Sequence, residues 1–478
     1  MRSLFIAIVL SFNLFGQSNV GYLFEELPND SVYNYSDNLH TTVYPQSWVS
    51  NNLSISNWHS RKFKKATLNF NPLLDLGAFY SKSFNYRSGL GLNFDGTIGK
   101  KWYFRVGYIQ GIFKGDSLFI PKSFVDQNFK KIEGFGDLRG RFSFTPSSLF
   151  NFQIGLDHQF IGEGCRSLFL SDYGRPYPFG LIRSRFWKVE YTVLYQFFRE
   201  IGGLGWKMKN AATHHISFNA TKWLNIGIFE SVVFQPKDTL LNRGFEVEYL
   251  NPVIFYRPQE YSIGSSDNVL LGASFNFKYK QHQLYTQLIL DEFFLSEIKA
   301  KSGWWANKYG GQIGIKGRFE MFSGKLFYRT EYNFVRPYTY AHLTSGQNYG
   351  NQGMTLAHPY GGNFMELLGE VKYQRGNFLF KLFMSYALQG LDKDGYSYGA
   401  DLYQPYTLRP YEYGHKIGQG LGNNSFRMVL TGAYNISKSG RLQVFFENHL
   451  RYDSALNSVS YLPFFGLRSQ LWNDYRNY

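Results

Sequence analysis

A long connection between two predicted strands holds the residues best suited to chemistry. It runs from Phe160 to Arg183 and reads FIGEGCRSLFLSDYGRPYPFGLIR. Charges of both signs and tyrosines occur together in it, namely Glu163, Arg166, Asp172, Tyr173, Arg175 and Tyr177. Carbohydrate sites use such a set, because planar rings cover sugar faces and bidentate groups bind hydroxyls and carboxylates. The alternative is a segment that folds into a barrel lumen as a structural constriction, and residue types alone favour it.

Catalytic signatures are missing from the sequence. The glycine-containing run 162–164 lacks the strand–loop–helix context and the Lys-Ser/Thr pair of a phosphate cradle. Cys165 would need a base and an electropositive pocket to act as a nucleophile, and Ser167 and Ser171 lack the G-x-S-x-G elbow. His214–His215 are adjacent, so on a strand they point to opposite faces and cannot share a metal. We therefore expect no enzyme, no cofactor and no metal site.

Alternating hydrophobic and polar residues predict the elements that position this connection. In 363–386 two alternating runs flank a turn at 374–376, which indicates a β-hairpin with one apolar face. Similar runs begin near Leu74 and continue along most of the chain. One face carries charges in strand after strand, so it cannot be a dry sandwich core, and the other carries few. A soluble sandwich would also alternate, so periodicity alone does not decide between a sandwich and a barrel.

The N-terminus and the composition favour a membrane barrel. Arg2 precedes an apolar run and small residues near Gly16, as in a secretory signal peptide cleaved near Gln17. Aromatic residues make up 19% of the 478 residues, and 48 residues are glycine. After the N-terminus, no apolar run approaches the roughly 20 residues of a membrane helix. The mean hydropathy of −0.31 does not exclude a barrel, because polar lumen residues cancel lipid-facing ones.

The charge balance points to anionic partners outside the cytoplasm. The formal net charge is +15, and export makes nucleic acid a poor candidate. We expect phosphate-bearing lipid head groups or acidic glycans as counter-charges. Cys165 is the single cysteine, so an internal disulfide framework is excluded.

Short turns alternate with long connections along the predicted barrel. The short turns lie near Gly99-Lys100, Pro146-Ser147, Thr221-Lys222, Gln281-His282, Ser323-Gly324, Arg375-Gly376 and Lys438-Ser439. The long connections are roughly 114–135, 159–182, 234–267, 293–310, 335–362 and 389–424. Such alternation is typical of the periplasmic and extracellular ends of outer-membrane barrels, and it gives about 18 antiparallel strands. We predict a signal peptide at 1–17, a periplasmic N-terminal arm or plug at 18–70 and the barrel at 71–478.

Several short motifs resemble the Wzi-like capsule-assembly family of outer-membrane proteins, which includes a RemB-like gliding-motility branch. The first is Gly162-x-Gly164 followed by Arg166-Ser167-Leu168-x-Leu170-Ser171 and Arg175-Pro176. Further matches follow in family order at Asn251-Pro252, Asp267-Asn268, Asp291-Glu292-Phe293 and Ala306-Asn307-Lys308-Tyr309-Gly310. Cys165 stands where the family more often has an aromatic residue.

The resemblance implies an 18-stranded barrel in the cell outer membrane of a Gram-negative bacterium, with a lumen obstructed by loops or a plug. It also implies a lectin-like protein that holds exported polysaccharide or capsule at the cell surface. A component of gliding or adhesion machinery and a porin remain alternatives. The ligand-binding candidates are Arg166, Ser167, Ser171, Arg175, Asp291 and Glu292. The two arginines would donate hydrogen bonds to acceptor groups, and the two acids would either pair with the arginines or accept hydrogen bonds from sugar hydroxyls. Both sets could equally form an ion-pair network that braces the lumen. The expected partners are surface polysaccharide, outer-membrane lipid and the barrel-insertion machinery, and we expect a monomer.

Overall fold

The computed structural model describes most of the chain after residue 58. The described residues are 40, 43–44, 59–80, 84–114, 134–202, 205–236, 249, 267–436 and 442–469. The predicted signal peptide at 1–17 lies outside them, and so does most of the predicted arm at 18–70.

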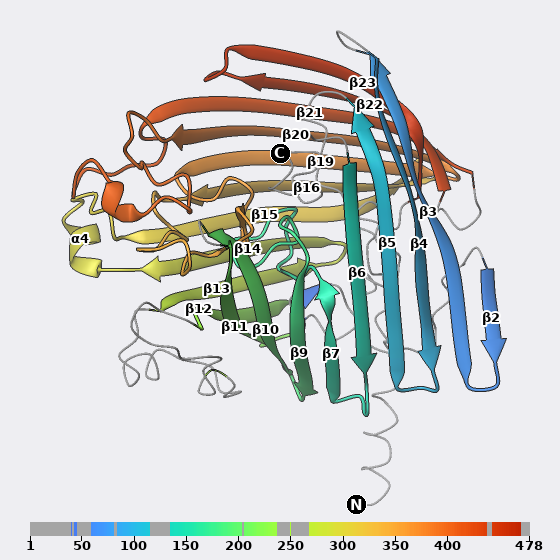
Figure 1. The fold of residues 1–478 in the computed structure, drawn as a ribbon. Coiled ribbons are helices and arrows are strands. Elements are labelled where there is room, and N and C mark those ends of the chain that lie inside the picture. The colour runs from blue at the N-terminus through green and yellow to red at the C-terminus, as the bar shows by residue number, and fades with distance from the viewer. Residues whose placement is uncertain are drawn as a thin grey trace, which may run out of the picture.

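The described chain forms a closed antiparallel barrel, in which each strand pairs with the next one along the wall (Figure 1). The 18 wall strands are β3 (Ala66–Tyr80), β4 (Phe84–Ile98), β5 (Trp102–Lys114), β6 (Gly134–Phe144), β7 (Phe150–Asp157), β9 (Tyr177–Phe186), β10 (Val189–Gly202), β11 (Gly205–Asn219), β12 (Leu224–Phe234), β13 (Asn268–Tyr279), β14 (His282–Glu292), β15 (Lys308–Met321), β16 (Gly324–Val335), β19 (Phe364–Arg375), β20 (Phe378–Leu391), β21 (Leu421–Asn435), β22 (Leu442–Asp453) and β23 (Ser458–Ser469). The predicted fold class is confirmed.

The barrel closes between its last and first strands. β23 pairs with β3 from Phe464↔Phe79 to Arg468↔Asp75. The first part of β3 extends beyond this contact, and there the short strand β2 (His59–Phe63) pairs with it. β2 therefore covers an edge that would otherwise expose unpaired backbone groups. The first wall strand begins at Ala66, slightly before the predicted start of the barrel at residue 71.

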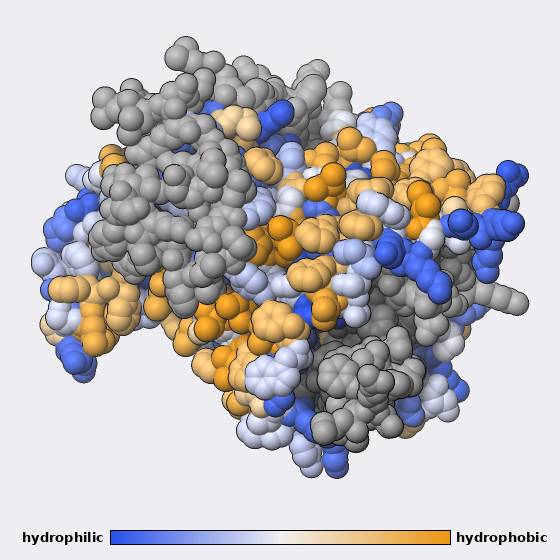
Figure 2. Space-filling model, turned by 90° about the horizontal axis from the view of Figure 1, so that it is seen from below, coloured by the Kyte–Doolittle hydropathy of each residue, from blue (hydrophilic) through white to orange (hydrophobic). Residues whose placement is uncertain are grey.

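Alternation along each strand separates a lipid-facing surface from the lumen. In β6, Leu138 and Phe142 are 49% and 41% exposed, whereas Asp137, Arg139 and Arg141 are at most 5% exposed. The same pattern recurs around the wall, so charged side chains gather inside and apolar ones outside. Seen from below, hydrophobic residues form a band across the face, with most hydrophilic residues towards its edges (Figure 2). This closed barrel with an apolar outer belt has the architecture of an outer-membrane protein, which confirms the predicted localisation.

The turns confirm most of the predicted connections. Six of the seven predicted short turns separate neighbouring strands, and the seventh, at Lys438-Ser439, lies outside the described residues. One stretch differs. Apolar and polar residues alternate from Trp187 to Phe197 as in a single strand, but Trp187 and Lys188 form a turn between β9 and β10, and Trp187 has φ of 52°. Alternation continues through a two-residue turn, so the pattern conceals it.

Several small elements are not part of the barrel wall. They are β1 (Val43–Tyr44), β8 (Phe160–Ile161), β17 (Gly350–Asn351), β18 (Met354–Thr355), the helix α4 (Leu295–Lys299) and the 3-10 helix η4 (Tyr406–Leu408). Among the described residues, no helix is long and apolar enough to cross a membrane.

Candidate functional site

The predicted connection from Phe160 to Arg183 folds into the barrel only up to Pro176, because Tyr177 begins the wall strand β9. We call residues 158–176 the inner loop. All of its side chains are buried except those of Cys165, Arg175 and Pro176, which are half-buried. β8 within it pairs with β1 from the N-terminal arm, with Val43 opposite Ile161. The interpretation of this segment as a lumen constriction is therefore the one that the structure supports.

The inner loop reaches wall strands far from its own ends. Phe169 stacks on Phe229 of β12, with ring centroids 4.7 Å apart. The backbone N–H of Leu168 donates to the side chain of Gln287 on β14 at 2.8 Å. Lys316 of β15 donates to Glu163 at 2.7 Å. Since the loop leaves β7 and returns at β9, these contacts carry it across the lumen.

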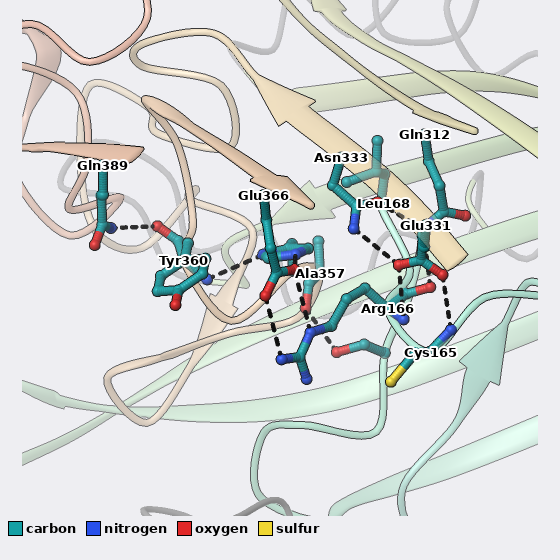
Figure 3. A network of polar contacts seen from close by, with 12 residues as sticks. Cys165, Arg166, Leu168, Gln312, Glu331, Asn333, Ala357, Tyr360, Glu366 and Gln389 are labelled. Atoms are coloured by element: carbon teal, nitrogen blue, oxygen red, sulfur yellow. Dashed lines mark hydrogen bonds and ion pairs between the residues drawn. The ribbon is translucent and has the colours of Figure 1, made fainter. Parts of the chain in front are cut away.

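Arg166 is the centre of a buried ionic network in this loop (Figure 3). Its guanidinium lies 3.5 Å from both carboxylate oxygens of Glu366 on β19. The same carboxylate contacts the His358 ring at 2.9 Å. The side chains of Arg166 and Glu366 are 0% exposed. Burial lowers the pKa of His358. A charge pair at this depth is expensive to separate, because neither partner can be solvated by water.

A second carboxylate, Glu331 of β16, receives the backbone of the same turn. The N–H groups of Cys165 and Arg166 donate to its two oxygens at 2.8 and 3.2 Å. Tyr285 and Asn333 donate to it as well, at 2.9 and 2.8 Å. Four donors thus surround one fully buried acid, so its hydrogen-bonding capacity is used within the protein.

The two predicted serines are also engaged. Ser167 Oγ donates to the Ile161 carbonyl and Ser171 Oγ to the Ala357 carbonyl, both at 2.6 Å. Ser167 is 0% and Ser171 4% exposed. In this conformation both hydroxyls hold backbone and are out of reach of a ligand.

A second long connection, residues 336–363, packs on the inner loop. The Tyr340 hydroxyl donates to the Leu168 carbonyl at 2.8 Å, and the Ser171 N–H donates to the Leu356 carbonyl at 2.7 Å. The hairpin β17–β18 belongs to this connection, and all four of its residues are buried. Two connections therefore fill the lumen together, and their apolar side chains share one core cluster with the wall.

Asp291 and Glu292 meet Lys308, which the sequence had not singled out as a site residue. Lys308 Nζ lies 3.0 Å from a Glu292 oxygen and 3.9 Å from an Asp291 oxygen. Asp291 also accepts a hydrogen bond from the Tyr340 N–H at 2.8 Å. Two motifs of the family resemblance thus form one structural unit, because the end of β14 and the start of β15 are paired neighbours.

The predicted ligand-binding residues therefore fall into two groups. Arg166, Ser167, Ser171 and Asp291 are at most 8% exposed, whereas Arg175 and Glu292 are half-buried. The predicted ion partners differ from the observed ones, since Arg166 pairs with Glu366 and the two acids pair with Lys308. A role of these six residues in glycan binding stays a prediction.

Aromatic side chains from three long connections meet at the long-loop end of the barrel. We call Trp304, Trp305, Tyr338, Tyr406, Tyr411 and His415 the outer aromatic cluster. Trp305 is central, with ring centroids 4.6 Å from Tyr406, 6.1 Å from Tyr338 and 6.3 Å from Trp304. Tyr411 packs on His415 at 4.4 Å and is itself 41% exposed. By the rule for outer-membrane barrels, the end with long loops faces the cell exterior.

Cations and backbone bonds hold this cluster together. The guanidinium of Arg409 lies over the Trp305 ring at 4.3 Å, and Lys308 lies 4.8 Å from the Tyr406 ring. Arg409 also forms an ion pair with the exposed side chain of Glu412. The Trp305 N–H donates to the Glu412 carbonyl at 3.1 Å. Rings, a guanidinium and a carboxylate are thus presented together on one braced surface, which is a set suited to sugar rings and hydroxyls.

The sequence carries a signal for this cluster that strand alternation does not reveal. Long connections of this chain contain paired tryptophans at 304–305 and closely spaced tyrosines at 406, 411 and 413. Regular periodicity finds strands and passes over such irregular segments. Among the described residues, no group of three or more His, Cys, Asp or Glu side chains is placed to hold a metal ion.

Comparisons with known proteins support the architecture. No family model and no curated protein sequence matches this chain. Among solved structures, it is similar to Wzi of Escherichia coli, described as an outer-membrane protein involved in group 1 capsule assembly and as a carbohydrate-binding β-barrel. That match has a TM-score of 0.56 and 14% identity, and it covers 84% of this chain and 85% of that one. OprD of Pseudomonas aeruginosa matches with a TM-score of 0.45 and 10% identity over 88% of this chain and 98% of that one. OpdK of the same organism, solved with vanillate, matches with a TM-score of 0.46 and 10% identity over 85% of this chain and 98% of that one. At these identities the likeness concerns the fold.

Proposed function

We propose that this protein is a lectin-like member of the Wzi-like family that binds exported surface polysaccharide through its outer aromatic cluster. The observation that carries the proposal is this cluster itself. It places half-exposed and exposed rings beside Arg409 and Glu412 at the end that faces the exterior. Planar rings bind sugar faces, while guanidinium and carboxylate groups bind hydroxyls.

The state of the lumen supports binding over transport. The inner loop and the connection 336–363 are packed against each other and against the wall, and hydrogen bonds such as those of Tyr340, Ser171 and Ser167 hold both connections within the protein. An open porin instead keeps a water-filled channel. We therefore expect the purified protein to show no steady conductance in a planar bilayer. A large, weakly selective current would favour the porin alternative.

The fold also supports the proposal. The similar barrel from Escherichia coli is described as carbohydrate-binding and as involved in capsule assembly. Deletion of the gene should release polysaccharide into the medium while leaving its synthesis intact. Normal retention of polysaccharide together with a motility defect would favour the gliding alternative.

A glycan array provides the direct test of the site. The variant Trp305→Ala with Tyr411→Ala should lose more than about tenfold in apparent affinity, as expected when central aromatic anchors are truncated. Trp223→Ala is the matched control, because Trp223 is 54% exposed in a short turn at the opposite end. Equal binding by the wild type and the double variant would remove the site assignment.

A further inference from the structure

At the end of the barrel opposite the outer aromatic cluster, the short turns carry charge of a single sign. The described ones are 64–65, 99–101, 145–149, 187–188, 220–223, 280–281, 322–323 and 376–377. Within these turns there are lysines and no Asp or Glu. We call these lysines the basic rim; they are Lys64, Lys65, Lys100, Lys101, Lys188, Lys222 and Lys280. All of them are exposed.

Several lysines of the basic rim have an aromatic residue as their neighbour. Lys188 lies 5.6 Å from the ring of Trp187, and Lys280 lies 5.3 Å from that of Tyr279. These two rings are 74% and 69% exposed. Lys222 directly precedes Trp223 in sequence. Exposed aromatic rings next to basic side chains are the pattern that membrane proteins place at the lipid–water boundary.

The basic rim is densest where the barrel closes. The turn at 64–65 touches the turn at 99–101, because the Gly99 N–H donates to the Lys65 carbonyl. Arg61 and Lys62 of β2 add two more exposed charges at this point. Within the described residues, none of these basic side chains forms an ion pair with a carboxylate. Their charges are therefore available to an external anion.

The opposite end of the barrel has no such bias. Its described loops expose or half-expose acids together with lysines, namely Glu297, Asp394, Asp401 and Glu412 with Lys299, Lys301, Lys393 and Lys416. The basic rim is thus a local feature and is not simply the net charge of +15 spread over the surface.

The basic rim adjoins the apolar belt. Phe63 and Ile98 flank its densest part and are 58% and 49% exposed. Arg61 is paired with Leu68, whose side chain faces lipid, so Arg61 lies on that side of β2. Long basic side chains at this level keep their stems against apolar surface and place their charges in the head-group layer. Lipid phosphates are the anions of that layer.

We propose that the basic rim binds the phosphate groups of anionic phospholipids in the periplasmic leaflet, with Lys64, Lys65, Lys100 and Lys101 as its principal site. This inference is independent of the glycan-binding proposal, because the two surfaces lie at opposite ends of the barrel. Basic side chains near an anionic membrane surface attract it, and the attraction is screened by salt.

The test measures lipid selectivity of the full-length mature protein reconstituted in vesicles. Spin-labelled phosphatidylglycerol and phosphatidylcholine are compared for the fraction held at the protein surface. We expect the wild type to prefer phosphatidylglycerol in low salt and to lose this preference in 1 M salt. In the variant with Lys64, Lys65, Lys100 and Lys101 changed to Gln, the selectivity for phosphatidylglycerol should fall at least about fivefold. This lower limit is the effect expected from the loss of a single basic residue.

The matched control removes the same charge from the other end, with Lys299, Lys301, Lys393 and Lys416 changed to Gln. It should keep the wild-type selectivity. Heat-modifiable migration in gels establishes that each variant is folded, and the salt titration of the wild type tests the proposal without any substitution. No preference in the wild type, or equal selectivity in both variants, would overturn it. The proposal would also be overturned, in favour of a polymer ligand, if the wild type showed no lipid selectivity but sedimented together with peptidoglycan sacculi, and if the first variant lost this co-sedimentation.

Discussion

Replacement of Arg166 by Ala should release the inner loop from the lumen. The substitution removes both contacts of the guanidinium with Glu366 and leaves a fully buried carboxylate beside His358. Loss of one partner from a buried pair costs about 3–5 kcal/mol. Every 1.4 kcal/mol is a factor of ten, so the undocked population of the loop should rise by about 100- to 4,000-fold.

Cys165 provides the assay without an engineered probe. It is the single cysteine of the chain and neighbours Arg166 in the inner loop. Its side chain is half-buried against Leu368, Phe383 and Val429, and burial raises the pKa of its thiol. Undocking exposes the thiol, so the rate of labelling by a bulky maleimide reports the undocked population. Single-channel openings in a planar bilayer should increase in parallel.

Two further variants make this test specific. Arg166→Met combined with Glu366→Leu removes both charges, and apolar replacement of a buried pair is often neutral or stabilising, so labelling should return towards the wild-type rate. Arg409→Ala breaks the pair with Glu412 in the outer loops and should leave labelling unchanged. If Arg166→Ala accelerated labelling by less than about fivefold, the pair would behave like a surface ion pair. The bracing role of Arg166 would then be refuted.

Three other outcomes follow from the same geometry. Gly399→Ala should detach the outer loops, because a Cβ at this position would lie 2.3 Å from the backbone nitrogen of Tyr338. The measurement is the rate at which a protease added to intact cells cleaves these loops. Gly395→Ala is the control and should behave like the wild type, because Gly395 has a similar positive φ but open space around it. Lys308→Met should loosen the same loops by about 3 kcal/mol or more, because Asp291 and Glu292 lose their cation; Lys299→Met is its exposed control, and equal protease resistance of the two would contradict the assignment. Burial lowers the pKa of His158 to about 4, so between pH 6.5 and 4 the undocked loop binds more protons than the docked loop, and docking loses stability as the pH falls through that window. Channel openings of the wild type should therefore become more frequent in that pH range, and those of His158→Gln should increase less. Fewer openings of the wild type in acid would contradict the predicted sign.

Strand positions were accessible from the sequence because lipid and lumen impose opposite demands on alternate residues. Leu138 and Arg139 are neighbours in the chain, yet one faces lipid and the other is buried in the lumen. Closure follows from the same demand, because an open sheet edge in lipid would leave backbone groups without partners. The Trp187–Lys188 turn was missed because a two-residue turn preserves alternation.

The partners across the lumen were not accessible in the same way. Periodicity places Glu366 on the inner face but does not say which cation meets it, and Arg166 lies 200 positions away in sequence. That choice depends on how the inner loop crosses the barrel. The outer aromatic cluster was missed for a related reason, since Trp305 and Tyr406 come from separate irregular loops that the strands bring together.

The energetics of the inner loop also determine where a glycan can bind. Contact with Arg166 requires separation from Glu366, at about 3–5 kcal/mol. It also requires exposure of Leu168, Phe169 and Leu170, which are 0% exposed and contribute about 1.5–3 kcal/mol each when buried. A micromolar ligand gains only about 8 kcal/mol in total, so these costs would consume its binding energy. Arg175 and Glu292 remain reachable without such rearrangement, and so does the outer aromatic cluster. The proposed glycan site is therefore the outer aromatic cluster, where stacking on Trp305 and Tyr411 would leave the inner loop docked.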